Sequence, residues 1–225
     1  MRTQYQNTMD ILYQDDRIFV CVKPSGVLST DAPGGMPERI RAHLGDANAC
    51  VRTVHRLDAA VAGVMIFARS RAAAELLSEQ IRSRRFEKEY LAVLNGIPSE
   101  PCGTLRDHLR YDRAARKASV VPPDTIGAKE AVLDYRVLDE KDGLALVQIH
   151  LHTGRTHQIR VQFAARGLPL YADRKYGAPI EGVSIALWSC RLRFTHPQTG
   201  LPVSFCRLPP DAEPWQRFSP ILLKD

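Results

Sequence analysis

The chain has 225 residues, of which 44% are hydrophobic and 25% are charged. This length suits one mixed or all-β domain, and the apolar content excludes general disorder, so we expect a single domain over residues 1–225. The 31 basic and 25 acidic residues give a net charge of +6, which favours a polyanionic partner without establishing one.

The cysteines and the apolar segments restrict the compartment. No two of the five cysteines form the close pair that a zinc ribbon uses, and reduced thiols are typical of a cytoplasmic protein. Residues 1–10 contain one arginine and no apolar core, and the longest apolar stretch, residues 61–68, is too short to span a bilayer. We therefore expect a cytoplasmic protein without membrane insertion.

The amino-terminal pattern indicates a β-hairpin. Residues 11–13 and 18–22 are strand-like and flank a polar turn. Pro24 and Gly26 then end the second strand, because proline lacks a ladder donor and glycine permits positive φ. A loop is expected to follow through residues 33–35.

The next segment predicts a strand, a helix and a second strand. Residues 63–69 form an apolar run, and Ser70 can cap a helix in which Ala73, Leu77 and Ile81 share one face. Residues 89–94 resemble another strand that stops at Asn95-Gly96.

The second half predicts more strands and one more helix. Residues 131–138 and 144–151 are strand-like, and Thr156 can cap a helix that runs toward Arg166 and stops at Gly167. Residues 185–187, 192–194 and 203–205 are brief strand candidates. Hairpin strands interrupted by two helices indicate an α+β fold with an antiparallel or mixed sheet.

One carboxylate has a suggestive position. Asp58 ends the run His55-Arg56-Leu57-Asp58 and precedes small residues that lead into a predicted buried strand. Taken alone, such an aspartate is more often a helix cap, a turn residue or a structural ion pair than a nucleophile. Its neighbours along the chain decide between these interpretations.

Five segments in order resemble the RluA-type RNA pseudouridine synthases, in a short form without an amino-terminal RNA-binding domain. The resemblance covers roughly residues 11–210. The matching segments are Val22-Lys23-Pro24-Ser25-Gly26, the His55–Asp58 run, Lys88-Glu89-Tyr90, Thr153-Gly154-Arg155-Thr156-His157-Gln158-Ile159-Arg160 and Asp173-Arg174-Lys175-Tyr176-Gly177. The resemblance implies a bent, largely antiparallel mixed sheet flanked by helices and loops.

Two positions depart from the family pattern. Val61-Ala62 stands where the family usually has Thr-Ser before a glycine, and Trp188-Ser189 stands where many members have His-Ala. The first departure removes a hydroxyl pair beside Asp58, so the loop support or the substrate preference is expected to differ.

The resemblance implies a catalytic set and no cofactor. It assigns the nucleophilic carboxylate to Asp58, its guanidinium partner to Arg155, and stacking on the target base to Tyr90. A phenol with a pKa near 10 is a poor base at neutral pH, which favours stacking for Tyr90. Isomerisation of uridine needs no redox or metal step, so we expect neither a cofactor nor a metal ion.

The resemblance also implies an RNA partner. Arg56 resembles an arginine that, in some relatives, enters the helix that the target base leaves. Three basic clusters interleave with the motifs, and each is either a solvated face or a phosphate track. The first contains Arg82, Arg84, Arg85 and Lys88, the second Arg106, Arg110, Arg113, Arg116 and Lys117, and the third Arg174 and Lys175. We expect RNA contacts from Arg56, His55, Arg85, Lys88, Arg160 and Lys175.

Two rival interpretations remain. His150, His152 and His157 have a spacing that superficially suits a metal hydrolase, although no paired acidic or cysteine ligands accompany them. Alternatively, the chain remodels RNA without isomerising it. The sequence does not distinguish ribosomal from transfer RNA, and we expect a monomer.

Overall fold

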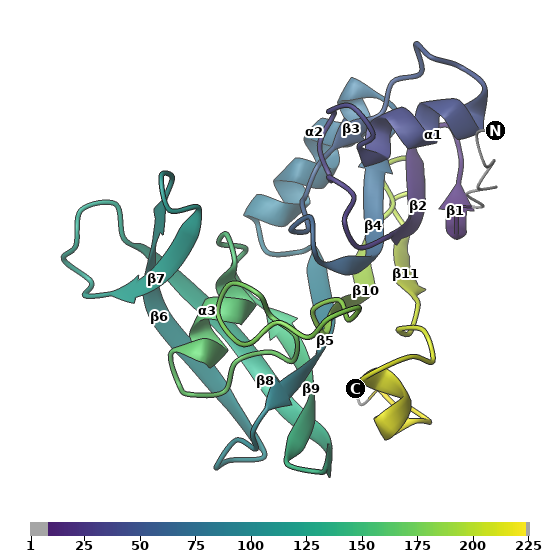
Figure 1. Cartoon of the computed structure of the whole chain (residues 1–225). Coiled ribbons are helices and arrows are strands. Elements are labelled where there is room, and N and C mark those ends of the chain that lie inside the picture. The colour runs from purple at the N-terminus through teal and green to yellow at the C-terminus, as the bar shows by residue number, and fades with distance from the viewer. Residues whose placement is uncertain (1–8, 224–225) are drawn as a thin grey trace.

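The computed structural model describes residues 9–223, with eleven strands, three α-helices and one short 3-10 helix in that range (Figure 1). The expectation of a cytoplasmic protein rests partly on residues 1–10, and most of these lie outside the described residues. None of the described helices combines the length and apolarity needed to cross a bilayer. The strands are β1 (Ile11–Gln14), β2 (Ile18–Lys23), β3 (Arg52–Thr53), β4 (Ala62–Ala68), β5 (Glu87–Asn95), β6 (Cys102–Asp112), β7 (Lys117–Val121), β8 (Lys129–Lys141), β9 (Leu144–Leu151), β10 (Leu187–Thr195) and β11 (Pro202–Cys206).

All described strands join one mixed sheet. Its main path is β1-β2-β4-β10-β5-β9-β8-β6-β7, with β3 beside β4 and β11 beside β10. Only β4 and β10 pair in parallel among the described strands, which fits the expected largely antiparallel sheet. Figure 1 shows two halves of the molecule, and β10 and β5 lie where they meet. The predicted α+β fold is confirmed.

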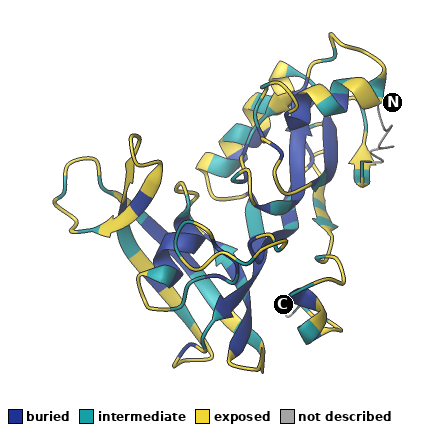
Figure 2. Cartoon of the chain, in the orientation of Figure 1, coloured by how far each residue is buried: buried dark blue, intermediate teal, exposed yellow. Residues whose placement is uncertain are grey.

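Both faces of the sheet are buried at β2 and β4. Phe19 and Phe67 pack into one apolar cluster, whereas their neighbours Val20 and Ile66 pack into another, because side chains alternate across a strand. β2 and β4 are accordingly buried along most of their length, whereas the edge strand β7 is mainly exposed (Figure 2).

The helices agree with the sequence in one case and differ in two. The predicted α2 (Arg71–Arg82) is confirmed, and the Ser70 side chain accepts a hydrogen bond from the Ala73 amide at 3.1 Å. The predicted cap of α3 (Gln158–Ala164) is wrong, since His157 precedes the helix in a left-handed conformation and gives no side-chain cap. The helix α1 (Met36–Leu44) was not predicted. Its signals were Pro37 in the first turn and the pair Met36 and Ile40, both buried.

The hairpin of β6 and β7 was also not predicted. In β6 only Leu105 and Leu109 are buried, and this spacing of four residues does not match strand alternation. The strand forms because β6 pairs with β8 over eight residues, and it carries exposed basic side chains. Tertiary pairing therefore overrides a weak local pattern.

Gly63 allows β4 and β10 to approach closely. Its φ is +124°, and a Cβ atom at this position would lie 2.3 Å from the Ser189 carbonyl oxygen and 2.5 Å from the Ser189 nitrogen. The Ser189 hydroxyl donates a hydrogen bond to the Val64 carbonyl at 3.0 Å. This joint between the two halves of the sheet therefore depends on a residue without a side chain.

Replacing Gly63 by alanine is expected to destabilise the fold by roughly 3 kcal/mol or more, because it adds both backbone strain and a clash. Gly200→Ala is a matched control, since Gly200 also has positive φ (+70°) but has no atom within 4 Å of an added Cβ. The control should lose only about 1–2 kcal/mol. Urea unfolding of both variants measures the difference, and equal losses would contradict the close approach.

Candidate active site

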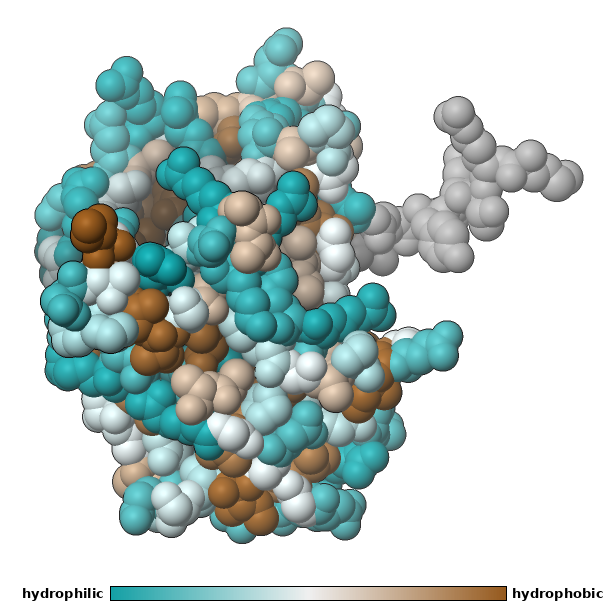
Figure 3. Space-filling view, turned by 60° about the vertical axis from the view of Figure 1, so that its left-hand side comes forward, coloured by the Kyte–Doolittle hydropathy of each residue, from teal (hydrophilic) through white to brown (hydrophobic). Residues whose placement is uncertain are grey.

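Asp58 lies in a groove with a volume of about 1030 Å³. The groove is lined by the segment around Asp58, by the end of α2, by β5 and by the loop between β9 and α3. A volume of this size is at the upper end of the range found for ligand sites. Hydrophilic side chains dominate the surface brought forward from the left of Figure 1, as Figure 3 shows.

Two polar side chains hold the segment before and after Asp58. The Ser29 hydroxyl donates to the Leu57 carbonyl at 2.8 Å and accepts from the Leu57 amide at 3.1 Å. The Lys23 ammonium donates to the carbonyl oxygens of Val27 and Ala59 at 2.8 and 3.0 Å. Asp58 is therefore fixed on both sides by contacts with the loop after β2.

Lys23 itself is fully buried. Besides those two carbonyls it donates to Pro24 at 2.9 Å, which satisfies its three N–H groups. Burial lowers the pKa of Lys23 to about 8, and the negative charge of Asp58 opposes this decrease. The early Lys-Pro motif thus supports the backbone under the candidate carboxylate.

Arg160 connects Asp58 to a second carboxylate. Its Nη1 donates to Asp58 Oδ2 at 2.9 Å, while its Nε and Nη2 donate to the two oxygens of Asp173 at 2.9 and 2.7 Å. Asp173 is completely buried, and Arg160 is 6% exposed. Because the planar guanidinium is held by the bidentate contact, its Nη1 is aimed at Asp58.

The expected pair of Arg155 and Asp58 is not found. Arg155 is exposed, and its Nε donates to the Glu130 carbonyl at 2.8 Å. The signature contains two arginines, and of these only Arg160 lies within α3, where it is buried. Arg155 precedes the helix and lines the groove. The sequence pattern alone does not show which of the two arginines is buried beside Asp58.

Tyr90 lies on β5 and lines the groove beside Asp58. The ring is 5% exposed, and burial raises the pKa of its phenol far above the usual value, with a further contribution from Asp58. Lys88 lies two residues earlier, on the same face of the strand, and burial lowers its pKa. Leu187 of β10 also lines the groove, whereas Leu192 packs in an apolar cluster instead.

Two residues expected to contact RNA are buried. His55 is 9% exposed, and its Nε2 accepts a hydrogen bond from the Ile66 amide at 3.2 Å. Burial lowers the pKa of His55 to about 3, so the ring is neutral. His55 therefore supports the loop, and Arg160 supports the two carboxylates. Neither side chain projects toward solvent, contrary to the RNA contacts that were expected of them.

The other expected RNA contacts are more accessible. Arg56 is exposed and lines the groove, as does Lys88. Arg85 is exposed but lies outside the groove lining, with its Nε bonded to the Ser83 hydroxyl at 3.0 Å. The Lys175 ammonium donates to the Arg116 carbonyl at 2.6 Å, which attaches the segment after α3 to the β6–β7 turn.

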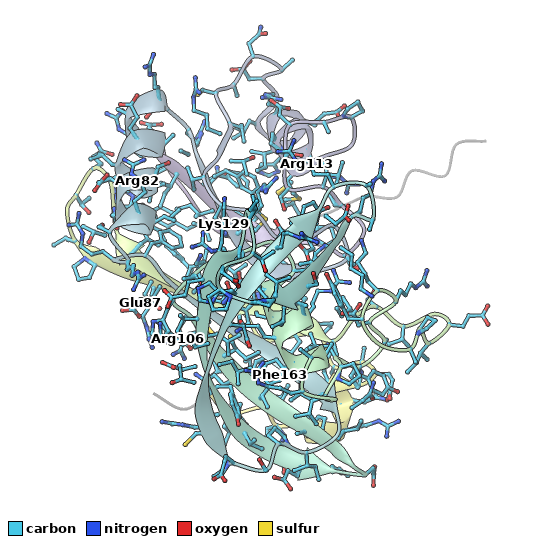
Figure 4. All side chains as sticks on the ribbon, turned by 90° about the vertical axis from the view of Figure 1, so that its left-hand side faces the viewer. Arg82, Glu87, Arg106, Arg113, Lys129 and Phe163 are labelled. Carbon is cyan, nitrogen blue, oxygen red and sulfur yellow. The ribbon has the colours of Figure 1, made fainter. Side chains whose placement is uncertain are left out.

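Basic side chains from distant segments share one face. In Figure 4, Arg82 on α2 and Arg113 in the β6–β7 turn lie on either side of Lys129. Arg84, which lines the groove, has a left-handed backbone with φ +57°. Members of the first two predicted basic clusters, Arg82 and Arg113, thus lie on this face.

Two histidines of the metal-site interpretation lie at the rim. The His150 and His152 rings are 4.9 Å apart, and His152 Nε2 lies 2.6 Å from Asp134 Oδ2. His157 lies apart from them, with Nε2 3.8 Å from Asp58 Oδ2. No group of three potential ligands that could hold a metal ion is present within residues 9–223.

Removing the charge of Asp173 should destabilise the protein in a pH-dependent way. Burial opposes ionisation, but hydrogen bonds from Arg160 outweigh it and hold the pKa of Asp173 below its ordinary value of 3.8. The native carboxylate therefore stabilises the fold at pH values above 3.8, and this contribution is lost as the pH falls through the lowered pKa. Asp173→Asn should cost roughly 3 kcal/mol at neutral pH.

Chemical unfolding from neutral to acidic pH measures this effect. The difference between wild type and Asp173→Asn should shrink toward the acid end. Asp31→Asn is the control, because its ion pair with Arg41 is largely exposed and should contribute little. A constant difference across this pH range would contradict the role assigned to the ionised Asp173.

Comparison with known proteins agrees with this geometry. The family model described as RNA pseudouridylate synthase matches residues 17–165. The dual-specificity RNA pseudouridine synthase RluA of Salmonella typhimurium is 36% identical over 213 residues, covering 89% of this chain and 93% of that protein. Ribosomal large subunit pseudouridine synthase D of Neisseria meningitidis is 34% identical over 218 residues, covering 88% of this chain and 57% of that protein.

A solved structure has the same fold. Human RNA pseudouridylate synthase domain containing 1 is 25% identical, with a TM-score of 0.76, and the match covers 91% of this chain and 84% of that one. The family match spans more than half of the chain and includes Asp58 and Arg160. The chain therefore belongs to the RluA-type RNA pseudouridine synthases, isomerases that convert uridine to pseudouridine in RNA.

Proposed function

We propose that this chain isomerises specific uridines of ribosomal or transfer RNA, with Asp58 as the nucleophile and without a cofactor. One observation carries the assignment of Asp58: its carboxylate lies in the groove, and Arg160 binds only one of its two oxygens. The names of the Neisseria and Salmonella relatives, which specify the large ribosomal subunit and a dual specificity, support the substrate class.

The proposed reaction moves one bond and one proton. Asp58 attacks C1′ of the ribose while the N1–C1′ bond breaks and its electron pair remains on the uracil. The uracil turns, and C5 then attacks C1′ as the carboxylate leaves. The proton on C5 departs and N1 gains one, so the product has the same atoms as the substrate.

Arg160 is proposed to keep the nucleophile ionised and oriented. A guanidinium 2.9 Å from Asp58 Oδ2 favours the charged carboxylate, and the bidentate contact with Asp173 prevents the guanidinium from turning away. This role replaces the one that the motif suggested for Arg155. The exposed Arg155 at the groove lining is better suited to a phosphate contact.

Tyr90 is proposed to stack on the target base. Its phenol keeps its proton at neutral pH, because burial and Asp58 both raise its pKa, so the hydroxyl serves poorly as a base. The ring lines the groove beside the carboxylate, where its flat face suits a uracil that turns during the reaction.

The RNA strand is proposed to follow the basic face. Arg56, Arg82, Arg84, Lys88 and Arg155 all line the groove, and Arg113 and Lys129 lie on the face that Figure 4 presents. Opposite charge attracts the phosphates, while extrusion of the target base brings C1′ to Asp58.

Asp58→Asn should reduce pseudouridine formation by roughly a thousandfold or more, because the amide cannot attack C1′. The amide is similar in size, so folding and RNA affinity should change little. Pseudouridine mapping of cellular RNA with wild type and variant measures the product, and a binding assay on the same RNA measures affinity. Wild-type protein that forms no pseudouridine would favour an RNA-binding protein without isomerase activity.

Arg84→Gln should weaken RNA binding and reduce its salt dependence. Loss of one phosphate contact lowers the slope of log K against log salt by about 0.7 for a single strand. Arg71→Gln is the matched control, because Arg71 begins the helix α2 that precedes Arg84, and it pairs with Glu75. Titrations at several salt concentrations measure both slopes, and the same slope for Arg84→Gln as for wild type would exclude this phosphate contact.

A further inference from the structure

The His157 side chain connects Asp58 to a tyrosine outside the proposed catalytic set. Its Nε2 lies 3.8 Å from Asp58 Oδ2, and its Nδ1 lies 2.9 Å from the hydroxyl oxygen of Tyr176. The His157 side chain is 10% exposed. Neither His157 nor Tyr176 has a role in the proposed reaction above.

The hydrogen bonds of Tyr176 determine which nitrogen of His157 carries the proton. The Ala118 amide donates to the Tyr176 hydroxyl oxygen at 2.7 Å, so this contact cannot accept the phenolic proton. Among the described residues, only His157 Nδ1 is left as an acceptor for it. Burial raises the pKa of Tyr176 to about 12, which keeps the phenol protonated. This arrangement favours an unprotonated His157 Nδ1 and a ring proton on Nε2.

The backbone and two rings hold the imidazole in this orientation. His157 has φ +58° and ψ +19°, a left-handed conformation that residues other than glycine adopt rarely. The rings of Tyr111 and Tyr176 contact the imidazole edge-on, at centroid distances of 5.8 and 5.6 Å. An uncommon conformation maintained by several contacts at a reactive site indicates a functional constraint.

We propose that His157 is a positioning residue that presents a neutral N–H to Asp58 Oδ2, with its tautomer set by the Tyr176 hydroxyl. The inference rests on the proposed function, because His157 acts through Asp58. At 3.8 Å the contact is electrostatic and too long for a hydrogen bond. Together with Arg160 it restrains Oδ2, which leaves Oδ1 as the oxygen that attacks C1′.

Neutrality of His157 matters because an imidazolium would pair with Asp58 and weaken it as a nucleophile. Burial lowers the pKa of His157, while Asp58 opposes this effect. The remaining charged or titratable groups that face the ring come from α3, from the segment after it and from β6, and they are Arg160, Asp173, Lys175, Tyr176 and Tyr111. The donor on Nδ1 further disfavours a second ring proton.

The first test is the tautomer itself. Nitrogen-15 NMR of the histidine ring in the wild-type protein should find Nε2 protonated and Nδ1 unprotonated at neutral pH. A proton on Nδ1, or an imidazolium, would overturn the proposal. This measurement needs no product, so it separates failure of this inference from failure of the proposed isomerase, which wild-type pseudouridine mapping tests.

The second test is the pH profile of single-turnover isomerisation. Tyr176→Phe removes the donor to Nδ1, so His157 can gain a proton beside Asp58. The rate of this variant should fall about tenfold between roughly pH 8 and pH 5.5, with recovery at the alkaline end. Wild type should not show this decrease. A Tyr176→Phe profile parallel to that of wild type would contradict the proposal.

Two further variants distinguish positioning from structural support. His157→Gln retains an N–H donor near the place of Nε2 and should keep more of kcat than His157→Leu, with KM nearly unchanged in both. For Tyr176→Phe the matched control is Tyr135→Phe, which also loses a tyrosine hydroxyl. The Tyr135 hydroxyl is bonded to the Glu100 carbonyl, away from the groove. Equal kcat for the Gln and Leu variants would overturn the role of the N–H.

Discussion

The guanidinium of Arg160 is the contact on which the site depends. It joins Asp58 to a carboxylate that is completely buried, and the two ends of its bond to Asp58 are 102 residues apart in sequence. A buried charge is costly unless it is paired, and here each of the three groups compensates another. Asp58 Oδ2 can therefore be held in the groove because Arg160 is itself anchored on Asp173.

The polar side chains around Asp58 also hold it in place, because they bind the backbone on either side of it. Lys23 and Ser29 use buried side chains to hold carbonyl and amide groups on either side of Asp58. His55 does so through the Ile66 amide. These contacts replace regular secondary structure in a segment that lies between β3 and β4. His55, which was expected to contact RNA, is thus used to hold the backbone of this loop.

The sequence predicted the elements with strong local patterns and the residues within dense motifs. α2 was found because Ser70 and the apolar positions Ala73 and Leu77 agree with helical spacing. Asp58 was singled out only through the order of its companion motifs. Arg160 was expected to contact RNA, but it is buried and bonded to Asp58 and Asp173. Which arginine of the signature is buried depends on where α3 begins, and Arg155 precedes that helix. The β6–β7 hairpin was missed because its pairing with β8 is long-range.

The strand order also has a consequence for synthesis. β10 (Leu187–Thr195) pairs with β4 (Ala62–Ala68) on one side and β5 (Glu87–Asn95) on the other, and it follows both by a long stretch of chain. Until β10 emerges from the ribosome, the two half-sheets present unpaired edges, which are prone to misassociation. Arg160 and Asp58 belong to different halves, so a nascent chain can have both residues and still lack a site. The candidate site is therefore complete only after β10 has joined the two half-sheets.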